Sequence, residues 1–260
     1  MPPVDKLVRL MKKILICLFL LFPVLFTCRS AIIVSGDVNI GNGIDGSAGA
    51  PIGDNGRFFA NILGGGTKVV LQEGYSQGSG LAAYGSIANY YTGRGVLVDA
   101  ITTPFSSSDL AGAQLLISGV PLSAYTPTEI SLMSSFLGAG NSILFMGENN
   151  AFPEGAAANG YINTALTSLG SSLRLVNALD DSNFHTAVGS QIAVNPLTAG
   201  VNSFVYAAVS EVSGGTPLFF TTSSAPFVMV EVPEPSAGAL LLAGLALFLS
   251  TVKSKSRRSS

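Results

Sequence analysis

The chain has 260 residues, of which 48% are hydrophobic and only 11% charged, and its formal net charge is −2. The cations sit mostly at the two ends: between Ala31 and Val232 four basic residues stand against thirteen acidic ones, a net charge of −9 for the body. A body this acidic repels nucleic acid, which excludes that class of partner. Both cysteines, Cys17 and Cys28, precede the body, which therefore has no disulfide, thiol nucleophile or cysteine metal site.

The first 31 residues resemble a secretory signal peptide. Met11 and two lysines precede an apolar run over 14–26, and small residues follow near the expected cleavage site. The run is too short to span a bilayer comfortably, so a cleaved leader over 1–31 is the first interpretation, with an uncleaved N-terminal anchor as the alternative. Translation can start at Met1 or at Met11, and Cys28 lacks the small preceding residues of a lipidated cysteine.

Residues 32–53 are rich in Gly, Asn, Asp and Ser and are interpreted as an irregular lead-in. Asp54 then precedes apolar residues at helical spacing, which predicts a capped helix over 55–63 that ends at Gly64. The folded α/β domain is therefore expected to begin at residue 54 and to end at residue 231.

Within this domain, short apolar runs alternate with amphipathic segments. The sequence predicts strands at 67–72, 95–99, 114–118, 142–146 and 172–176, helices at 81–91, 127–137 and 160–169, and a connecting turn at 108–112. The clearest helix start is Thr126, with Pro127 at the first helical position and Glu129 completing a capping box. Continuous apolar strands alternating with helices predict an α/β fold, a mostly parallel sheet with helices on both faces.

The pattern changes after residue 180. Four further apolar runs, at 192–194, 204–207, 217–221 and 227–231, have no helix between them. This β-rich C-terminal extension is expected either to lengthen the edge of the sheet or to form a small antiparallel appendage.

Polar side chains near the carboxyl ends of the strands are the candidate site. Ligands of open α/β sheets bind at that edge, so Glu73, Asp99, Glu148 and Asn149 are expected to share it. Such carboxylates can bind a divalent cation or act as an acid–base pair, and the plainer interpretation is that they form turns. His185, the only histidine, is either a general base there or a hydrogen-bonded structural residue. No catalytic or metal-ligating role is assigned to any residue.

Two known sequence motifs are not used to assign a function. The run from Gly78 through Gly80 to Ala83 fits the dinucleotide fingerprint, but the loop from Gln72 is too long for it, so no cofactor is expected. A Gly-x-Ser-x-Gly spacing occurs at residues 74–78 in the same long glycine-rich loop, and no nucleophile role is assigned to Ser76.

The tail has three parts. Pro233-Glu234-Pro235 comes first, followed by 17 uncharged residues from Ser236 to Val252 and then by four cations. As a helix, 17 residues rise roughly 26 Å, enough for a transmembrane segment over 236–252 with its cations on the cytoplasmic side. A plain C-terminal anchor would have the same topology.

This order of parts resembles the PEP-CTERM sorting signal of Gram-negative bacteria, here spanning residues 232–260. The resemblance implies that an exosortase in the membrane recognises the tail and cuts near Pro233, Glu234 and Pro235. It also implies a host that makes exopolysaccharide or biofilm matrix. It covers only the tail and leaves the body undefined.

The body is similar to the flavodoxin-like, class I glutamine-amidotransferase-like fold. The similarity lies in residues 109–117 before Gly119, in 125–137 and in 140–147. It extends over about Lys68 to Val176 and implies a flavodoxin-like sheet. Active members carry a cysteine in a sharp strand–helix turn, which this body lacks, so their chemistry is not implied.

Together these patterns predict an exported, membrane-processed protein of the cell surface or extracellular matrix, non-catalytic and associated with exopolysaccharide. Its expected partners are an exosortase and, through residues 236–252, the inner membrane. The alternative is a secreted hydrolase-type enzyme that uses carboxylates at the carboxyl edge of the strands.

Overall fold

The computed structural model describes residues 30–73 and 81–232. The predicted leader up to residue 29, the glycine-rich loop 74–80 and the tail from Pro233 onward lie outside these ranges, so the sorting motif and the helix over 236–252 are not described. Within the described ranges, no helix combines the length and the apolar character needed to cross a membrane.

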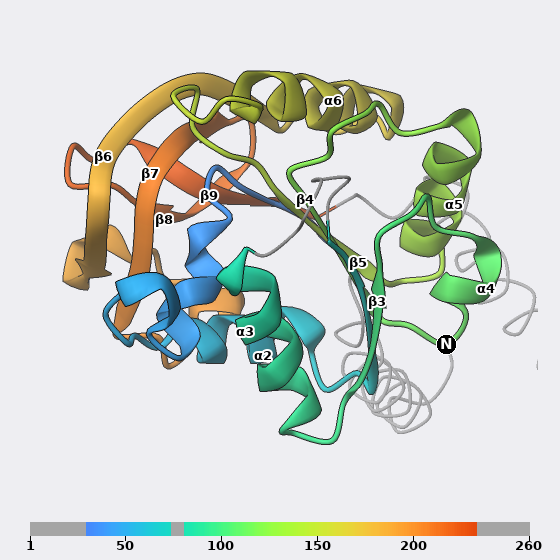
Figure 1. The fold of residues 1–260 in the computed structure, drawn as a ribbon, viewed down its shortest axis with the longest axis horizontal. Coiled ribbons are helices and arrows are strands. Elements are labelled where there is room, and N and C mark those ends of the chain that lie inside the picture. The colour runs from blue at the N-terminus through green and yellow to red at the C-terminus, as the bar shows by residue number, and fades with distance from the viewer. Residues whose placement is uncertain (1–29, 74–80, 233–260) are drawn as a thin grey trace, which may run out of the picture.

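The centre of the molecule is a seven-stranded sheet with the order β3-β2-β4-β5-β1-β9-β8 (Figure 1). The strands β3, β2, β4, β5 and β1 run parallel to their neighbours, β9 is antiparallel to β1, and β8 is antiparallel to β9. Their bounds are β1 Ile32–Ser35, β2 Lys68–Gln72, β3 Leu97–Ile101, β4 Leu115–Gly119, β5 Ser142–Met146, β8 Thr216–Phe220 and β9 Pro226–Glu231.

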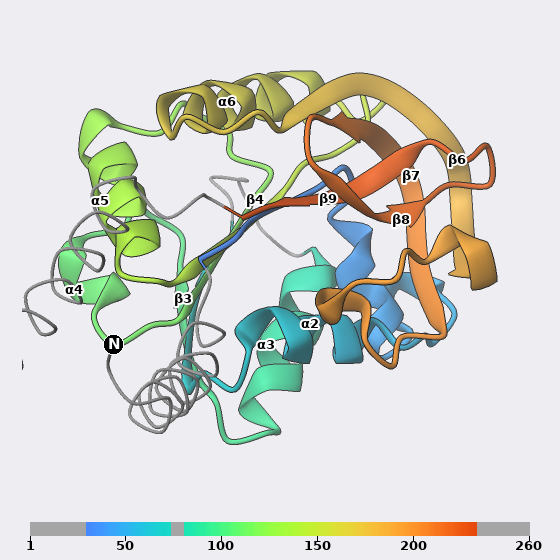
Figure 2. The same cartoon turned by 180° about the vertical axis from the view of Figure 1, so that it is seen from behind.

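Helices cover both faces of this sheet (Figures 1 and 2). α2 and α3 pack on one face, and α5 and α6 pack on the other. The helices are α2 Asn55–Leu63, α3 Ala82–Thr92, α4 Ser107–Leu110, α5 Pro127–Gly138 and α6 Gly155–Ser168. The predicted mostly parallel α/β architecture is therefore confirmed.

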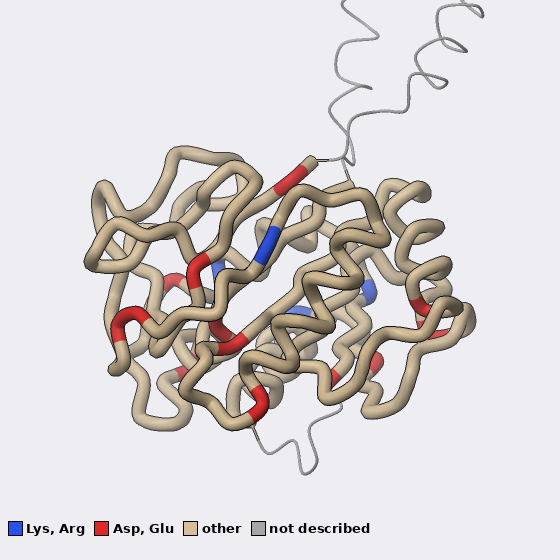
Figure 3. The backbone as a smooth tube through the Cα atoms, turned by 90° about the horizontal axis from the view of Figure 1, so that it is seen from above, with Lys and Arg blue, Asp and Glu red and all other residues tan. Residues whose placement is uncertain are grey.

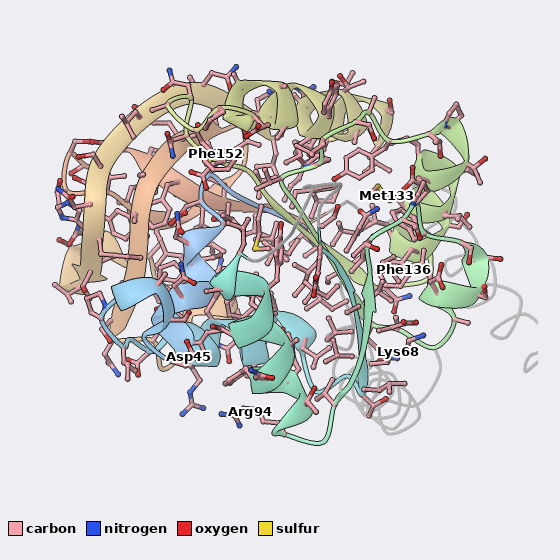
Figure 4. All side chains as sticks on the ribbon, viewed as in Figure 1. Asp45, Lys68, Arg94, Met133, Phe136 and Phe152 are labelled. Atoms are coloured by element: carbon pink, nitrogen blue, oxygen red, sulfur yellow. The ribbon has the colours of Figure 1, made fainter. Side chains whose placement is uncertain are left out.

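Local signals placed several elements correctly. β5 and α2 have the predicted bounds. At the start of α5 the Thr126 hydroxyl accepts from the Glu129 amide at 3.2 Å, and Glu129 Oε2 accepts from the Thr126 amide at 2.9 Å, which is the predicted capping box. Met133 and Phe136 point from α5 toward the sheet and are buried there (Figure 4).

The interpretation of residues 32–53 as an irregular lead-in is wrong. Ile32–Ser35 is β1, which pairs in register with β5 on one side and β9 on the other. Ala31 already belongs to the sheet, because its carbonyl accepts from the Ile143 amide at 2.9 Å. Only four residues, three of them apolar, form this strand, and they follow the apolar leader directly, so the pattern did not separate them. Two short 3₁₀ helices, Asn39–Ile44 and Ser47–Gly49, follow.

The predicted strand at 172–176 also has a different place. It is the start of β6, Arg174–Val188, which pairs antiparallel with β7, Ser203–Ser213, in a separate two-stranded sheet. The position beside β5 where a parallel fifth strand would pair is occupied by β1. Both alternatives for the C-terminal extension are therefore present: β8 and β9 lengthen the main sheet, while β6 and β7 form the antiparallel appendage.

Several boundaries are shifted. The predicted strand at 192–194 makes only a single bridge, between Ile192 and Phe219. The turn at 108–112 contains the short helix α4, and β3 lies two residues later than predicted. α6 begins at Gly155 rather than at residue 160. A Cβ on Gly155 would lie 1.9 Å from the Asn149 carbonyl oxygen, so this helix start needs glycine.

Hydrogen bonds of β7 attach the second sheet to the rest of the molecule. The Ser210 amide of β7 donates to the Gly36 carbonyl at 2.9 Å, and the Gly36 amide donates to the Phe227 carbonyl at 2.8 Å. The buried side chain of Asn55 donates to the carbonyls of Ile40 and Val205, each at 2.8 Å, and accepts from the Val205 amide at 2.8 Å. These bonds tie α2, the segment after β1 and β7 into one body.

Candidate functional site

The carboxyl ends of the parallel strands form the candidate site. β3 lies next to β2 on one side, whereas β4 and β5 lie on the other side of β2 within the sheet. The direction in which successive strands are added therefore reverses between β2 and β4. Such switch points are where open α/β sheets bind ligands. β2 ends at Gln72, β4 at Gly119, β5 at Met146 and β1 at Ser35.

Asp37, two residues after β1, is fully buried at this edge. Its Oδ1 accepts from the Asn39 amide at 2.6 Å, and its Oδ2 accepts from the Ala207 amide of β7 at 2.8 Å. Burial raises the pKa of Asp37 to about 7, because the hydrogen bonds that favour the carboxylate only partly offset the loss of solvation. The carboxyl group therefore connects the end of β1 to the second sheet.

Glu148, two residues after β5, is only 4% exposed. Its Oε1 accepts from the Asn149 amide at 2.8 Å and from the Asn149 side-chain amide. Burial, and secondarily the negative charge of Asp37, raises the pKa of Glu148 to about 8. Two neighbouring buried carboxyl groups thus disfavour each other's ionisation, so the pair retains protons near neutral pH.

Asn159 of α6 positions the backbone of Glu148. Its Oδ1 accepts from the Glu148 amide at 3.1 Å, and its Nδ2 donates to the Glu148 carbonyl at 2.6 Å. The Ser210 hydroxyl of β7 donates to the same carbonyl at 2.9 Å. Both residues are buried, so the loop that carries Glu148 is held between α6 and the second sheet.

Tyr84, from the first turn of α3, reaches the same edge. Its side chain is 1% exposed, and its hydroxyl has no hydrogen-bond partner in the structure. A Cβ on Gly119 would lie 2.6 Å from that hydroxyl, which places the oxygen against the end of β4. Burial raises the pKa of Tyr84, and Tyr125, Glu73 and Glu148 raise it further through their charges. The phenol oxygen is therefore close to the carboxylates of two strand ends.

A chain of buried hydrogen bonds borders this region on the α5 side. The Ser118 hydroxyl donates to Gln72 Oε1 at 2.6 Å and shares a bond with the Tyr125 hydroxyl at 2.8 Å. Gln72 Nε2 in turn lies 3.4 Å from Glu129 Oε1. These bonds join β2, β4 and α5, and they hold the ends of the two strands in fixed relative positions.

The structure brings together three of the five residues that the sequence singled out. Glu73 follows β2, and Glu148 and Asn149 follow β5, all at the carboxyl edge. Asp99 is in the middle of β3, opposite Val70, rather than at its end. Its carboxylate pairs with Lys68 Nζ at 3.5 Å, so the expectation that it shares the edge is wrong.

His185 lies in the second sheet. Its Nε2 is 3.8 Å from Asp181 Oδ1, and its ring stacks on Tyr206 with centroids 5.9 Å apart. Asp181 also accepts from the Tyr206 hydroxyl at 2.6 Å and from the Thr222 amide at 2.9 Å. Burial opposes ionisation of Asp181, but the bonds from Thr222 and Tyr206 outweigh it and lower the pKa. His185 thus belongs to a polar cluster that ties β6 to the turn after β8, and no hydrogen bond joins it to Glu148 in the described chain.

Sequence reasoning missed Asp37 and Tyr84. Asp37 fell inside the segment interpreted as irregular, although the run Ile-Ile-Val-Ser-Gly-Asp resembles a buried strand followed by a turn. Tyr84 looked like one apolar position of a helix face, and only its missing hydrogen-bond partner distinguishes it. The sequence alone does not show whether a hydroxyl has a hydrogen-bond partner.

The body's cations lie away from this edge. Figure 3 shows acidic residues spread over the backbone and few basic ones among them. Lys68 donates to the carbonyls of Asp109 and Ala111 near α4 (Figure 4), Arg94 lies over the Tyr90 ring, and Arg174 donates to two nearby carbonyls. Neither of the ion pairs among the described residues involves Asp37, Glu73 or Glu148.

Two surface hollows lie elsewhere. One of about 630 Å³ is formed within the loop 189–202, and one of about 290 Å³ lies between α5 and α6 next to Tyr125 and Tyr161. Neither is lined by Asp37, Tyr84 or Glu148. The buried carboxyl groups of the edge are suited to proton exchange, and no set of three metal-ligating side chains converges in the described ranges.

The turn between β4 and α5 is strained at Val120, whose φ is +39°. A positive φ at a β-branched residue is unusual and costs on the order of 1–3 kcal/mol. The Val120 amide donates to the Met146 carbonyl at 2.8 Å, and its side chain is buried. The strained turn therefore presents an apolar side chain, with no nucleophile at this position.

Comparison with known proteins adds two distant likenesses. No protein-family model matches the chain, and no curated protein does. A solved structure described as the mmIFT52 N-terminal domain is 17% identical and matches 53% of this chain and 72% of that one, with a TM-score of 0.41. IMPa from Pseudomonas aeruginosa, solved in complex with an O-glycopeptide, is 17% identical and matches 54% of this chain and 15% of that one, with a TM-score of 0.32. At these TM-scores neither likeness bears on fold or function.

Proposed function

We propose that the chain is exported, handed to an exosortase by its tail, and released as a non-catalytic component of the cell surface or extracellular matrix. The observation that carries the proposal is the order of the tail: Pro233-Glu234-Pro235, then 17 uncharged residues, then four cations. An apolar segment followed by cations is retained with its basic end in the cytoplasm, which leaves the body outside. The leader over 1–31 supports the same direction of export.

The association with exopolysaccharide and biofilm is the part of the proposal that rests on resemblance to the PEP-CTERM group. The composition of the body is compatible with it. A body with four basic and thirteen acidic residues remains soluble and repels other polyanions, so its partner is neutral or cationic.

The proposal extends to the fold, for which we infer a flavodoxin-like layout. In support, β3-β2-β4-β5 follow the order 2-1-3-4 of that fold. The departure is the fifth place, which β1 occupies from the N-terminal side. The resemblance to class I glutamine amidotransferases is restricted to this layout, because the strained turn after β4 carries Val120 where a nucleophile would be needed.

Mass spectrometry of the mature protein from its native host tests the sorting proposal. We expect a C-terminus near Pro235. A double substitution, Pro233→Ala with Pro235→Ala, leaves the segment 236–252 intact and should give an uncut, membrane-retained chain. A wild-type protein that keeps Arg258 would reduce the tail to a simple anchor and overturn sorting.

A second candidate function is a hydrolase-type activity, favoured by one observation. Glu148 has a pKa raised to about 8 by burial, as a general acid requires, and Glu73 lies on the neighbouring side of Tyr84. If the protein hydrolyses polysaccharide or peptide, Glu148→Gln should lower kcat by about 10²-fold or more while leaving the fold intact. Absence of turnover by the wild-type protein on host exopolysaccharide and on peptides would remove this candidate.

A further inference from the structure

The ends of β2, β4 and β5 surround a phenol that has no partner. β2 and β4 are neighbours with Gln72 opposite Ser118, and β4 and β5 are neighbours with Gly119 opposite Met146. Adjacent strands are about 4.8 Å apart. The Tyr84 hydroxyl lies against Gly119, so it sits over the middle strand, between Glu73 on one side and Glu148 on the other.

The carboxylates after the two neighbouring strands have unoccupied acceptor oxygens. Both hydrogen bonds to the Glu148 carboxylate go to Oε1, which leaves Oε2 available. The Glu73 carboxylate has no hydrogen bond or ion pair within the described residues, and Glu73 is half-buried. A buried hydroxyl without a partner is costly, so the Tyr84 hydroxyl indicates a group that completes it.

The charge of the region selects the class of ligand. Asp37, Glu73 and Glu148 bring three carboxyl groups to the same edge, and an approaching cation favours the ionised form of the two whose pKa burial raises. Lys68, Arg94 and Arg174 make their contacts elsewhere. An anion such as phosphate is repelled. A primary ammonium group supplies the missing positive charge and three N–H donors, which match Tyr84 Oη, Glu148 Oε2 and the Glu73 carboxylate.

We propose that the carboxyl edge of β2, β4 and β5 is a binding site for a primary ammonium group, held by Tyr84, Glu73 and Glu148. Tyr84 and Glu148 are buried and Glu73 is half-buried, so the site takes an ammonium head on a narrow stem. Two sources share this chemistry, an amino sugar and a lysine-type alkylamine. The inference concerns the body alone and does not depend on the sorting tail.

Calorimetric titration of the full-length chain in detergent tests the proposal. The probes are n-butylamine and glucosamine, each with its neutral counterpart, n-butanol and glucose, and calcium chloride as a separate probe. We expect saturable binding of an amine and at least tenfold weaker binding of its neutral counterpart. Binding of glucosamine alone identifies an amino sugar, binding of butylamine alone identifies a lysine-type amine, and binding of both means that the ammonium group suffices.

Three substitutions locate the site. Tyr84→Phe and Glu73→Gln should each weaken amine binding about tenfold or more, because each removes a hydrogen bond to a charged group. Glu73 is half-buried, and its side chain makes no hydrogen bond or ion pair within the described residues, so Glu73→Gln should leave the fold intact. Asp99→Asn, a carboxylate of the same sheet that faces Lys68, is the matched control and should leave the affinity unchanged.

Four results would overturn the proposal. They are equal binding of the amines and their neutral counterparts, wild-type affinity in both Tyr84→Phe and Glu73→Gln, binding of calcium with no binding of amine, and no binding of any probe. The last result would leave the cluster as a structural one completed by water.

Discussion

The parallel part of the main sheet and the β6–β7 sheet differ in what stabilises them. The central parallel strands β2, β4 and β5 are mostly apolar and buried, and neighbouring residues with strong local signals form each of them. The β6 strand is largely exposed, contains Asp180 and Asp181, and has two register breaks against β7. Its position depends on partners far away in sequence. The positions of the central parallel strands are therefore encoded by neighbouring residues, whereas the position of the β6–β7 sheet depends on its contacts with the rest of the molecule.

The largest effect is expected at the joint between the two regions. A Cβ on Gly36 would lie 1.8 Å from the Ser210 carbonyl oxygen, an overlap that only backbone movement relieves. We expect Gly36→Ala to lower the free energy of unfolding by about 3 kcal/mol or more, measured by urea denaturation. Gly85→Ala in α3, where a Cβ meets nothing within 4 Å, is the control and should stabilise by about 0.5–1 kcal/mol. Equal effects of the two substitutions would contradict the joint.

Asn55 tests whether the second region can be detached from the first. Its buried amide makes three bonds, to Ile40 and to both backbone groups of Val205. Asn55→Ala leaves these groups unsatisfied and should cost about 2–3 kcal/mol. In hydrogen exchange, protection should fall in β7 more than in β4 and β5. Asn61→Ala, which removes the more exposed bonds to Leu197 and Ala199, is the control with a smaller effect.

Raising the pH should weaken the contacts between the two regions more gradually than a substitution does. The folded pKa values of Asp37 and Glu148 are raised to about 7 and about 8, from 3.8 and 4.5. At pH values between the unfolded and the folded pKa values, the folded state holds protons that the unfolded chain has lost. The free energy of unfolding is therefore highest near the unfolded pKa values and falls as the pH rises to about 8. For each proton by which the two states differ, the free energy of unfolding falls by about 1.4 kcal/mol per pH unit.

Thermal melts from pH 5 to pH 8.5, in wild type and in Glu148→Gln, measure this slope. Glutamine cannot ionise, and the substitution removes the negative charge that disfavours ionisation of Asp37. The stability of the variant should therefore depend less on pH over this range. A wild-type protein that becomes more stable between pH 5 and pH 8 would show that the buried pair does not govern the pH response.

The smallest effect is expected within the parallel part of the main sheet. Asp99 pairs with Lys68 at 3.5 Å, and its side chain is 41% exposed. Solvent screens such a pair, so Asp99→Asn should change the free energy of unfolding by less than about 1 kcal/mol. Urea denaturation checks this, and a loss comparable to that of Asn55→Ala would show that the edge strand β3 depends on specific contacts as well.

Several elements could be predicted because their signals are local. The start of α5 is marked by Thr126, Pro127 and Glu129, which can be recognised without the rest of the chain. In Ser142–Met146, four apolar residues follow the serine. β1 could not be predicted in this way. Its four residues follow an apolar leader directly, and only pairing with β5 and β9 shows that they are a strand.

The candidate site divides along the same line. Glu148 and Glu73 follow recognisable strands, so their shared edge could be predicted from the order of elements. Asp99 was misplaced because β3 is shifted by two residues, and strand ends are poorly marked by composition. Asp37 joins the site only because β1 inserts next to β5, and Tyr84 is notable only because its hydroxyl is left without a partner.

By itself the sequence determined the alternation of strands and helices, the capped start of α5, the acidity of the body and the apolar character of both ends, because periodicity, capping and charge are properties of neighbouring residues. Only the tertiary structure decided which strand lies beside β5, that β6 leaves the main sheet, and that Asp37, Glu148 and Tyr84 meet at one edge. Strand pairing and burial join residues more than a hundred positions apart, and no local pattern carries that information.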